Sequence, residues 1–327
     1  MLMAMEIGQL EALVAVARLG GFTRAAAALN LSQPAVSRRL GLLEGELGAP
    51  LFERIPSGIV LTAAGQAFLP HAEALLASMR DGVDAVRALE GTDRGAITLA
   101  LVGTLASTTV TECLRGFRET YPGVTIRLRT ALSHEVSALV RRGDATLGLR
   151  YGADLHPDLT AATIYQEPRV VVCAPLHRLA HARSVNPGRL AGEAWIGFPV
   201  RPDEPEEPYG TSLRQSLATC GLGTAEIIAI DSLTAQKRMV EAGFGLALLP
   251  ESSVDEELRA GTLRALTVPA IRVTLPVVLI HRRRAYLSGA VRRLMALLAT
   301  RPIKRVAHRS RPESSRRRPA GSSPGHS

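Results

Sequence analysis

Hydrophobic residues in the first 61 positions recur at helical spacing and predict three short helices. The first helix stops at Gly20-Gly21, and its apolar face consists of Leu10, Leu13, Val14 and Ala17. In the second helix, Thr23 is placed to cap the first turn and Asn30 suits a left-handed position at the end. Ser32 can cap a third helix, whose buried stripe consists of Val36, Leu40 and Leu43.

The third helix presents polar side chains on the face opposite its buried stripe. Pro34 falls in the first turn, where a missing amide hydrogen costs little, and the outward-facing residues are Gln33, Ser37 and Arg38. Two short helices joined by a tight turn form a helix-turn-helix, whose second helix fits the major groove of DNA. Gln pairs with adenine and Arg with guanine, while Ser and Arg also hold phosphate. An ordinary solvated helix face is the alternative for an isolated helix.

The segment LFERIPSGIVLT, residues 51–62, predicts two short strands around a turn at Pro56-Ser57-Gly58. This hairpin follows the third helix directly and is expected to form a wing beside it, which favours DNA binding over a plain solvated face. Arg54 stands at the base of the wing, where it can contact phosphate. Four arginines of this domain are candidates for phosphate contact: Arg24, Arg38, Arg39 and Arg54. If they share one face, each protomer neutralises about four phosphates.

Residues 62–90 predict one long helix that follows this DNA-binding domain of residues 1–61. Its apolar stripe consists of Phe68, Ala72, Leu75, Met79, Val83 and Val86. At 1.5 Å per residue the helix spans roughly 43 Å, which is too long an apolar stripe to leave in water. Pairing with a second copy is the expected solution, and packing against the chain's own C-terminal domain is the alternative. Residues 91–93 are expected to form a flexible joint.

From Gly95 onward, strands and helices alternate, which predicts an α/β domain with a parallel sheet. The expected strands are 96–103, 124–131, 145–150, 169–175, 226–230, 244–250 and 273–280, with another near Trp195. The expected helices are 109–122, 133–143, 211–218, 233–243 and 289–300. The last strand and helix lack partners in the second unit, so the chain is expected to cross back to the first. Residues 91–300 would then form two lobes around a hinged cleft, lobe I from 95–165 and 269–300, and lobe II from 166–268.

Polar residues follow the strands at the edge where open α/β sheets bind ligands, and helix N-termini there point amide hydrogens at anions. The candidates in lobe I are Thr104, Leu105, Ser107, Thr130, Ser133 and Arg150. Those in lobe II are Phe198, Arg201 and Ser232. Arg150 can hold a carboxylate with two hydrogen bonds, or it can form a surface or interlobe salt bridge. For Thr104 and Ser133, plain helix capping is as good an explanation as ligand contact.

Charge is concentrated at the C-terminus. The chain of 327 residues has a net charge of +9, of which residues 301–327 carry +7. This basic segment is rich in Pro, Ser and Arg and is expected to be disordered. It either adds nonspecific DNA contact or is an inert extension.

The sequence has no apolar run of the roughly 20 residues that a membrane span requires. It also lacks a secretory signal pattern at its start. We therefore expect a cytoplasmic protein with no membrane association.

Catalytic and metal-binding patterns are not found in the sequence. There is no phosphate-binding GxxxxGK motif, GxSxG elbow or pair of catalytic carboxylates, so neither an enzyme nor a cofactor is expected. His177 and His181 have the i, i+4 spacing of metal ligands, but neighbouring prolines indicate a loop, and no metal is expected. Three widely spaced cysteines indicate reduced core thiols, with a peroxide-sensing pair as the alternative. They are Cys113, Cys173 and Cys220.

The stretch FTRAAAALNLSQPAVSRRLGLLEGELGAPLFERIPSGIVLTAAG resembles the winged helix-turn-helix of bacterial LysR-type transcriptional regulators. The segments FRETYPGVTIRL and VEAGFGLALLPES resemble the effector domain of the same family, so the resemblance covers about residues 6–300. It implies an N-terminal winged helix-turn-helix, a long linker helix for dimerisation and a two-lobed effector domain like periplasmic solute-binding proteins. The DNA-binding residues that it implies, together with those argued above, are Thr23, Arg24, Ser32, Gln33, Pro34, Ser37, Arg38, Arg39 and Arg54.

The same resemblance implies a homodimer or homotetramer that binds double-stranded promoter DNA and responds to a small-molecule effector, with a carboxylate as the candidate. RNA polymerase is a further implied partner. The family pattern differs at Arg39, at Ala131, in GDATLGL and in the acidic insertion RPDEPEEPYG. A rival interpretation is a solute-binding module in which the N-terminal helices serve only protein association. An enzyme in the C-terminal cleft is a third interpretation, which the missing catalytic pattern disfavours.

Overall fold

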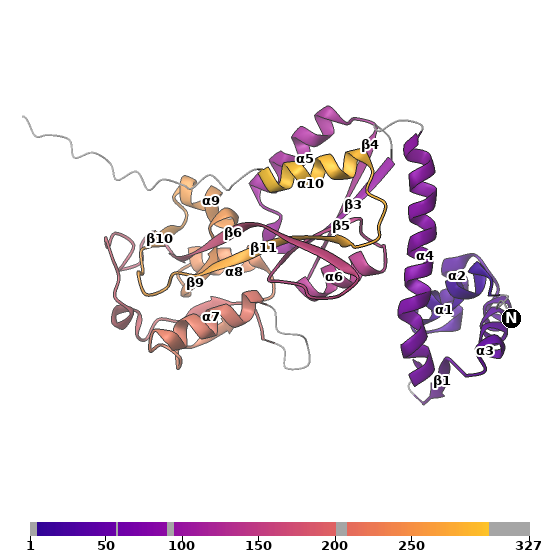
Figure 1. Cartoon of the computed structure of the whole chain (residues 1–327). Coiled ribbons are helices and arrows are strands. Elements are labelled where there is room, and N and C mark those ends of the chain that lie inside the picture. Colours follow the sequence, from indigo (N-terminus) through magenta and orange to yellow (C-terminus); the bar gives the residue numbers. More distant parts are fainter. Residues whose placement is uncertain (1–4, 57, 90–94, 201–207, 301–327) are drawn as a thin grey trace, which may run out of the picture.

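The computed structural model describes residues 5–56, 58–89, 95–200 and 208–300, which form a small helical head, a long helix and a two-lobed α/β domain (Figure 1). The expected joint at 91–93, the C-terminal segment 301–327, Arg201 and Ser57 lie outside the described residues. The head contains α1 (Ile7–Leu19), α2 (Phe22–Leu29), α3 (Gln33–Leu47), β1 (Phe52–Ile55) and β2 (Gly58–Leu61). These elements match the predicted winged helix-turn-helix.

The turns of the head depend on left-handed backbone positions. Gly20, with φ of 64°, ends α1, and Asn30, with φ of 55°, ends α2 as expected. The prediction that Thr23 caps α2 is wrong, because Gly21 is the N-cap and Thr23 lies inside the helix. The chain already turns at the two glycines, so the helix begins at Phe22. The Phe22 ring makes an edge-to-face contact with the ring of Phe52, which lies on the wing.

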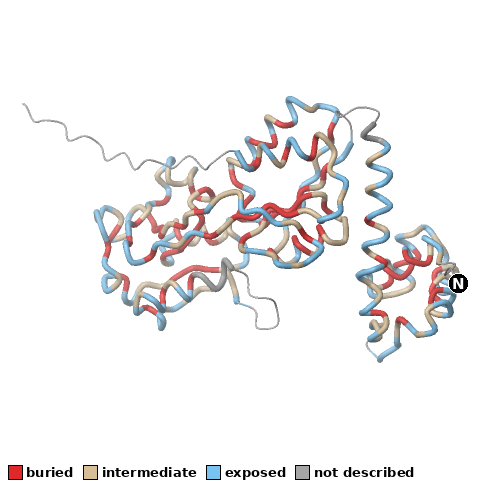
Figure 2. Tube along the Cα trace, in the orientation of Figure 1, coloured by how far each residue is buried: buried red, intermediate tan, exposed pale blue. Residues whose placement is uncertain are grey.

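Helix α4 (Ala63–Leu89) is continuous and stands between the head and the α/β domain in Figure 1. Its N-terminal part packs into the core of the head, where Ala72 is fully buried and Phe68 is partly buried. Beyond the head the helix is largely exposed (Figure 2).

The α/β domain is built around a 9-stranded sheet with the strand order β4-β3-β5-β11-β6-β9-β7-β8, in which β10 also pairs with β6. The strands are β3 (Gly95–Val102), β4 (Val124–Ala131), β5 (Leu147–Tyr151), β6 (Leu159–Cys173), β7 (Trp195–Gly197), β8 (Ile227–Ala229), β9 (Leu246–Pro250), β10 (Arg264–Leu266) and β11 (Thr274–Arg282). The helices are α5 (Thr108–Thr120), α6 (Ser133–Arg141), α7 (Pro208–Thr219), α8 (Leu233–Glu241), α9 (Glu251–Ala260) and α10 (Gly289–Thr300), with short 3₁₀ turns η1 (Gly103–Leu105) and η2 (Pro187–Leu190). Helix α9 and strand β10 are absent from the sequence-based prediction.

The sheet is mixed, so the expectation of a parallel sheet is only partly correct. Strand β3 is parallel to β4 and β5, and β7 is parallel to β8 and β9. At the centre, β11 is antiparallel to β5 and β6, and β6 is antiparallel to β9. The reason is connectivity: these strands join the two lobes directly, without the crossover helix that parallel neighbours need.

Two separate hydrophobic cores define the lobes. In lobe I the sheet packs against α5 and α10 on one side and α6 on the other, and in lobe II the sheet packs against α7 on one side and against α8 and α9 on the other. Strand β6 pairs with β11 up to Pro168 and with β9 from Arg169 onward. The Arg169 amide donates to the Val273 carbonyl at 2.9 Å, so the two crossing segments lie side by side at this hinge.

Candidate DNA-binding surface and effector cleft

The outer face of α3 is exposed and polar at its N-terminal end. Ser32 caps the helix as predicted, its Oγ accepting from the Ala35 amide at 3.3 Å. The exposed residues of this face include Gln33, Pro34, Ser37 and Arg38, whereas the buried stripe consists of Val36, Leu40 and Leu43. The buried stripe fixes the rotation of the helix, which leaves Gln33 and Arg38 available to an external partner.

Two of the predicted DNA-binding arginines also contact the backbone of α1. The Arg24 guanidinium donates to the Gly20 carbonyl at 2.9 Å, at the C-terminal end of α1. The half-buried Arg39 donates to the Gly8 carbonyl at 3.4 Å, and a Cβ at Gly8 would lie 2.9 Å from its Nη1. Arg39 therefore packs over Gly8 and joins α3 to α1.

The wing is held against α3 by Glu44. Its carboxylate accepts from the Leu51 amide at 2.7 Å, just before β1. Strands β1 and β2 pair as an antiparallel hairpin in which Arg54 faces Ile59, and Arg54 is exposed. At the same open end of the hairpin, Thr62 Oγ1 donates to the Pro50 carbonyl at 2.7 Å, and the chain continues from Thr62 into α4. The wing and the exposed end of α3 thus belong to one rigid head.

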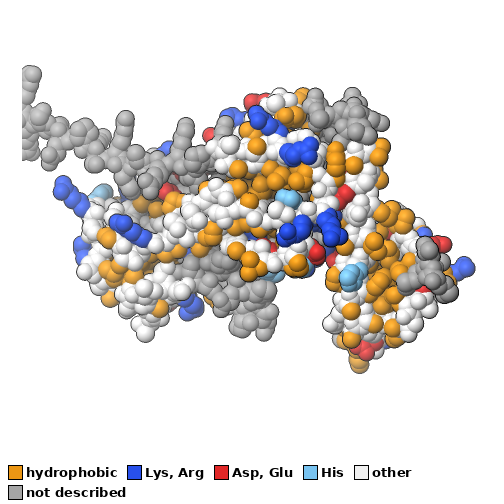
Figure 3. All heavy atoms as spheres, in the orientation of Figure 1, with side chains coloured by type: hydrophobic (Ala, Val, Ile, Leu, Met, Phe, Trp, Pro, Cys, Tyr) orange, Lys and Arg blue, Asp and Glu red, His pale blue; other side chains and the backbone are white. Residues whose placement is uncertain are grey.

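The predicted apolar stripe of α4 divides into two parts. Phe68 and Ala72 pack inside the head, whereas the remaining residues are exposed by 45–64%. The exposed residues are Leu75, Met79, Val83 and Val86. Hydrophobic side chains gather over α4 and the head in the space-filling view (Figure 3). An apolar row of this length on a single helix is typical of an interface with another helix.

The carboxyl ends of the parallel strands of lobe I bring several predicted cleft residues together. Thr104 and Ser107 follow β3 and are both buried, and Thr104 donates to the Tyr151 hydroxyl at 3.2 Å. Thr130, at the end of β4, is exposed, whereas Ser133, the first residue of α6, is only 1% exposed. The Ser133 hydroxyl has no hydrogen-bond partner among the described residues. Leu105 is fully buried in the core of lobe I.

Arg150 forms a salt bridge inside lobe I rather than presenting a free guanidinium. Its Nη1 lies 2.5 Å from Asp154 Oδ2 and donates to Ser137 Oγ at 2.7 Å. Burial raises the pKa of Asp154, but hydrogen bonds from Ser137 and from the His156 amide, with the charge of Arg150, outweigh burial and leave the pKa lowered. This salt bridge lies inside lobe I and is mostly buried, so it differs from the surface or interlobe pair that was the alternative to ligand contact.

The facing edge of lobe II consists of residues that follow β7 and β8. Phe198 follows β7 and packs against the core of lobe I, so its ring crosses from one lobe to the other. Ser232 caps α8, accepting from the Ala235 amide at 3.4 Å. Nearby, the buried Gln236 donates to the Ile230 carbonyl at 2.7 Å, while its Oε1 has no hydrogen-bond partner among the described residues.

A buried carboxylate lies at the hinge between the lobes. Glu167 on β6 is 0% exposed, and its Oε1 accepts from the Ser252 amide at 3.2 Å in the first turn of α9. Burial raises the pKa of Glu167 to about 7, although the hydrogen bond from Ser252 acts in the opposite direction. Burial, together with the charge of this carboxylate, raises the pKa of Tyr165. No sequence motif pointed to Glu167, Gln236 or Tyr151.

The remaining candidate groups have ordinary structural environments. His177 lies 3.2 Å from Glu193, His181 is exposed, and the described residues contain no cluster of metal-ligating side chains. Cys113 and Cys173 are buried in different lobes, and burial raises the pKa of Cys173 to about 11. In the part of the chain that the structure describes, no helix has the length and apolarity to cross a bilayer.

Two family models match the head and the α/β domain. The LysR substrate binding domain matches residues 90–302, and the bacterial regulatory helix-turn-helix protein, lysR family, matches residues 7–66. The chain therefore belongs to the LysR family of transcriptional regulators.

Individual relatives agree with this assignment. The regulator CfxR of Cupriavidus necator is 30% identical over 82% of this chain and 82% of its own length. The RuBisCO operon transcriptional regulator of Allochromatium vinosum is 29% identical over 88% of this chain and 93% of its own.

Solved structures share the fold along most of the chain. Full-length CbnR in complex with its target DNA has a TM-score of 0.62 and 26% identity, covering 90% of this chain and 99% of that one. A full-length OxyR variant from Pseudomonas aeruginosa has a TM-score of 0.68 and 21% identity, covering 90% and 93%.

Proposed function

We propose that this protein binds promoter DNA through the exposed end of α3 and the wing. The observation that carries the proposal is the polar surface of Gln33, Ser37 and Arg38 on a helix whose opposite face is buried in the head. Gln33 and Arg38 suit base edges in the major groove, and Arg54 on the wing suits the phosphate backbone. The similarity to CbnR, whose structure includes its target DNA, supports this assignment.

The protein acts as a homodimer or homotetramer in this proposal. The exposed apolar residues of α4 form a row along one helix, and a second copy of the same helix can cover that row. Two heads then reach successive major grooves of one duplex. Doubling the number of phosphate contacts also makes binding strongly dependent on salt.

A small-molecule effector binds between the lobes in this proposal, with carboxylates as the leading class. Thr104 and Ser107 follow β3, and the N-terminus of α6 follows the neighbouring strand β4, so this edge supplies hydroxyl and amide donors suited to an anion. Because Arg150 is paired with Asp154, the donors of the anion are the hydroxyls and amides of this edge. Phe198 already bridges the lobes, so a ligand that changes its contact changes the lobe closure.

Regulation rather than catalysis is the role that the relatives support, since those named above are transcriptional regulators. A regulator placed on promoter DNA would act on transcription through RNA polymerase. The direct test is a gel shift with a duplex from the region upstream of the gene. A retarded band at low ionic strength supports the proposal, and no retardation with full-length protein contradicts it.

A further inference from the structure

The turn that follows α6 contacts the DNA-binding head of the same chain. Asp144, in this turn of lobe I, lies 3.0 Å from Arg18 in the last turn of α1. Arg18 also lies 3.0 Å from Glu73 on α4, and Arg142 approaches both carboxylates at 3.2 and 3.8 Å. These four side chains, Arg18, Glu73, Arg142 and Asp144, form an ionic latch between three parts of the molecule.

The latch is more enclosed than an ordinary surface ion pair. The side chains of Glu73 and Asp144 are only 14% and 13% exposed, although each carries a charge. Glu73 faces two guanidinium groups and Asp144 faces three, the third being that of Arg80 at 3.8 Å, so the attractions to the arginines add to one another. A network of this kind contributes more than the single exposed pairs that are common on protein surfaces.

The backbone beside the latch is shaped for close approach to α4. Gly143 has φ of +70°, and a Cβ at this position would lie 2.8 Å from the Cβ of Ala77. Ala77 is fully buried under the turn. Arg80 donates to the Arg142 carbonyl at 2.8 Å. A glycine facing an alanine therefore lets lobe I lie directly on α4, with the charged groups around the contact.

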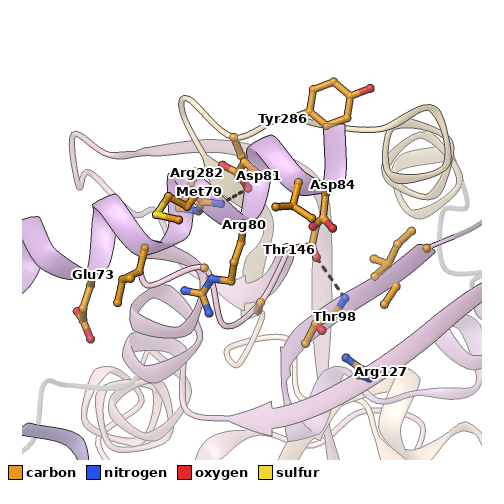
Figure 4. Close-up of a pocket in the computed structure, with 18 of the residues that line it drawn as sticks. Glu73, Met79, Arg80, Asp81, Asp84, Thr98, Arg127, Thr146, Arg282 and Tyr286 are labelled. Atoms are coloured by element: carbon orange, nitrogen blue, oxygen red, sulfur yellow. Dashed lines mark hydrogen bonds and ion pairs between the residues drawn. The ribbon is translucent and has the colours of Figure 1, made fainter. Parts of the chain in front are cut away.

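A second ion pair joins lobe I to the same helix further along. Arg282, the last residue of β11, lies 2.5 Å from Asp81 on α4. The pair lines a cavity of about 780 Å³ between the head, α4 and lobe I, together with Arg80, Asp84 and Arg127 (Figure 4). Contacts at both Asp144 and Asp81 oppose rotation of lobe I about α4.

Helix α6 connects this contact to the edge of the cleft. Its first residue, Ser133, belongs to the cleft edge of lobe I, and its last turn leads into Arg142 and Asp144. The helix has 9 residues and packs on β5, β3 and β11, which fix it to the sheet along its length. A shift of its N-terminal end during lobe closure would be transmitted to the latch.

We propose that the ionic latch holds the DNA-binding head of each chain in one orientation relative to its own effector domain. Its regulatory meaning rests on the proposed function, whereas the latch itself is a property of the protein without DNA. A contact made of arginine and carboxylate groups is weakened by salt and by removal of either charge. The head then samples a wider range of orientations.

The test measures the distance between spin labels on the head and on lobe I in the full-length protein without DNA. Cysteines are introduced at the exposed positions Ala28 on α2 and Arg115 on α5, with Cys220→Ser to remove the half-buried native thiol. Mixing labelled with excess unlabelled protein isolates distances within one chain. Asp144→Asn and Arg18→Gln break the latch from opposite sides. The matched control is Asp255→Asn, which breaks the 2.6 Å pair with Arg259 within α9.

We expect a narrow distance distribution in the parent protein and a distribution about twofold wider in both latch variants. The control should match the parent, and about 1 M salt should broaden the parent toward the latch variants. Arg18→Gln alone decides the test if Asp144→Asn does not fold. Equal widths in the parent and the folded latch variants would overturn the proposal. Because no DNA is present, this result is independent of whether the protein binds a promoter.

Discussion

The hydroxyl groups of Thr104 and Tyr151 lie 3.2 Å apart, where β3 and β5 end side by side at the cleft edge of lobe I. Strand alternation directs Tyr151 toward Thr104 and directs its neighbour Arg150 to the opposite face, against Ser137 of α6. The Tyr151 side chain is fully buried, so in the proposed function its hydroxyl orients the Thr104 hydroxyl at this edge.

Replacing Tyr151 by Phe should weaken effector binding while the fold is retained. The change removes one hydroxyl next to Thr104, and loss of a single hydrogen bond should lower affinity for an anion by about tenfold. The measurement is thermal-shift screening of the full-length protein with a panel of small carboxylates. The control is Tyr286→Phe, an exposed tyrosine away from this edge. If no carboxylate stabilises the parent protein, the proposed ligand class is wrong.

Replacing Glu167 by Gln should raise stability above neutral pH. The pKa of Glu167 is about 7 in the folded protein against an ordinary 4.5, so the folded state keeps a proton that the unfolded chain loses between these values. The Glu167 carboxyl therefore lowers the free energy of unfolding as the pH rises from 4.5 to about 7. The amide oxygen of the substituted glutamine retains an acceptor for the Ser252 amide without the buried charge.

At about pH 8 the Glu167→Gln variant should be more stable by up to about 3 kcal/mol, and the difference should shrink as the pH falls toward 4.5. Melting temperatures of parent and variant across this pH range give the comparison. A constant difference at all pH values would show that the carboxyl group does not titrate in the folded protein near neutrality.

Replacing Gly65 by Ala should destabilise the junction between the wing and α4. A Cβ at Gly65 would lie 2.2 Å from the Leu51 carbonyl oxygen, which belongs to the backbone and cannot move aside freely. The free energy of unfolding should fall by about 2 kcal/mol. In contrast, a Cβ at Gly45 in α3 would meet nothing within 4 Å, so Gly45→Ala should raise the free energy of unfolding by up to about 1 kcal/mol. Urea denaturation of both variants tests the contrast, and similar effects at the two positions would refute it.

Charged substitutions on the exposed stripe of α4 should separate the protomers. Leu75→Glu together with Val86→Glu places two like charges in the proposed helix interface, where a second copy would have to bury them. Light scattering should then give the mass of one chain. Ala74→Glu, an exposed position beside the stripe, is the control and should leave the assembly intact. An unchanged mass in the double variant would mean that the protomers associate elsewhere.

Local signals were sufficient to predict the elements of the head, although not the capping residue of α2. The caps at Ser32 and Asn30, the helical spacing of Val36 and Leu40, and the turn before Gly58 all act within a few residues. The structure agrees with these expectations because the head is small and its elements follow one another in space. The resemblance to the family added the assignment of roles to these positions.

Contacts between distant segments were not predictable in the same way. Arg39 reaches the Gly8 carbonyl on α1, and Arg150 on β5 reaches Ser137 on α6. Glu167 follows no recognisable motif, and its burial depends on α9, which the hydrophobic pattern did not reveal. Strand order at the hinge likewise depends on the crossing of β6 and β11, which a linear pattern does not encode.

In the proposed function, Gln33 and Arg38 on α3 read DNA bases. The most direct measurement is fluorescence anisotropy of the full-length protein with a labelled duplex from upstream of its gene, compared with a random duplex at one salt concentration. Gln33→Ala and Arg38→Ala should each weaken the binding free energy by about 1–3 kcal/mol on the upstream duplex and change it little on the random duplex. Arg292→Ala, an exposed arginine on α10, should change neither. Equal losses on both duplexes, or no binding by the parent protein, would contradict the account.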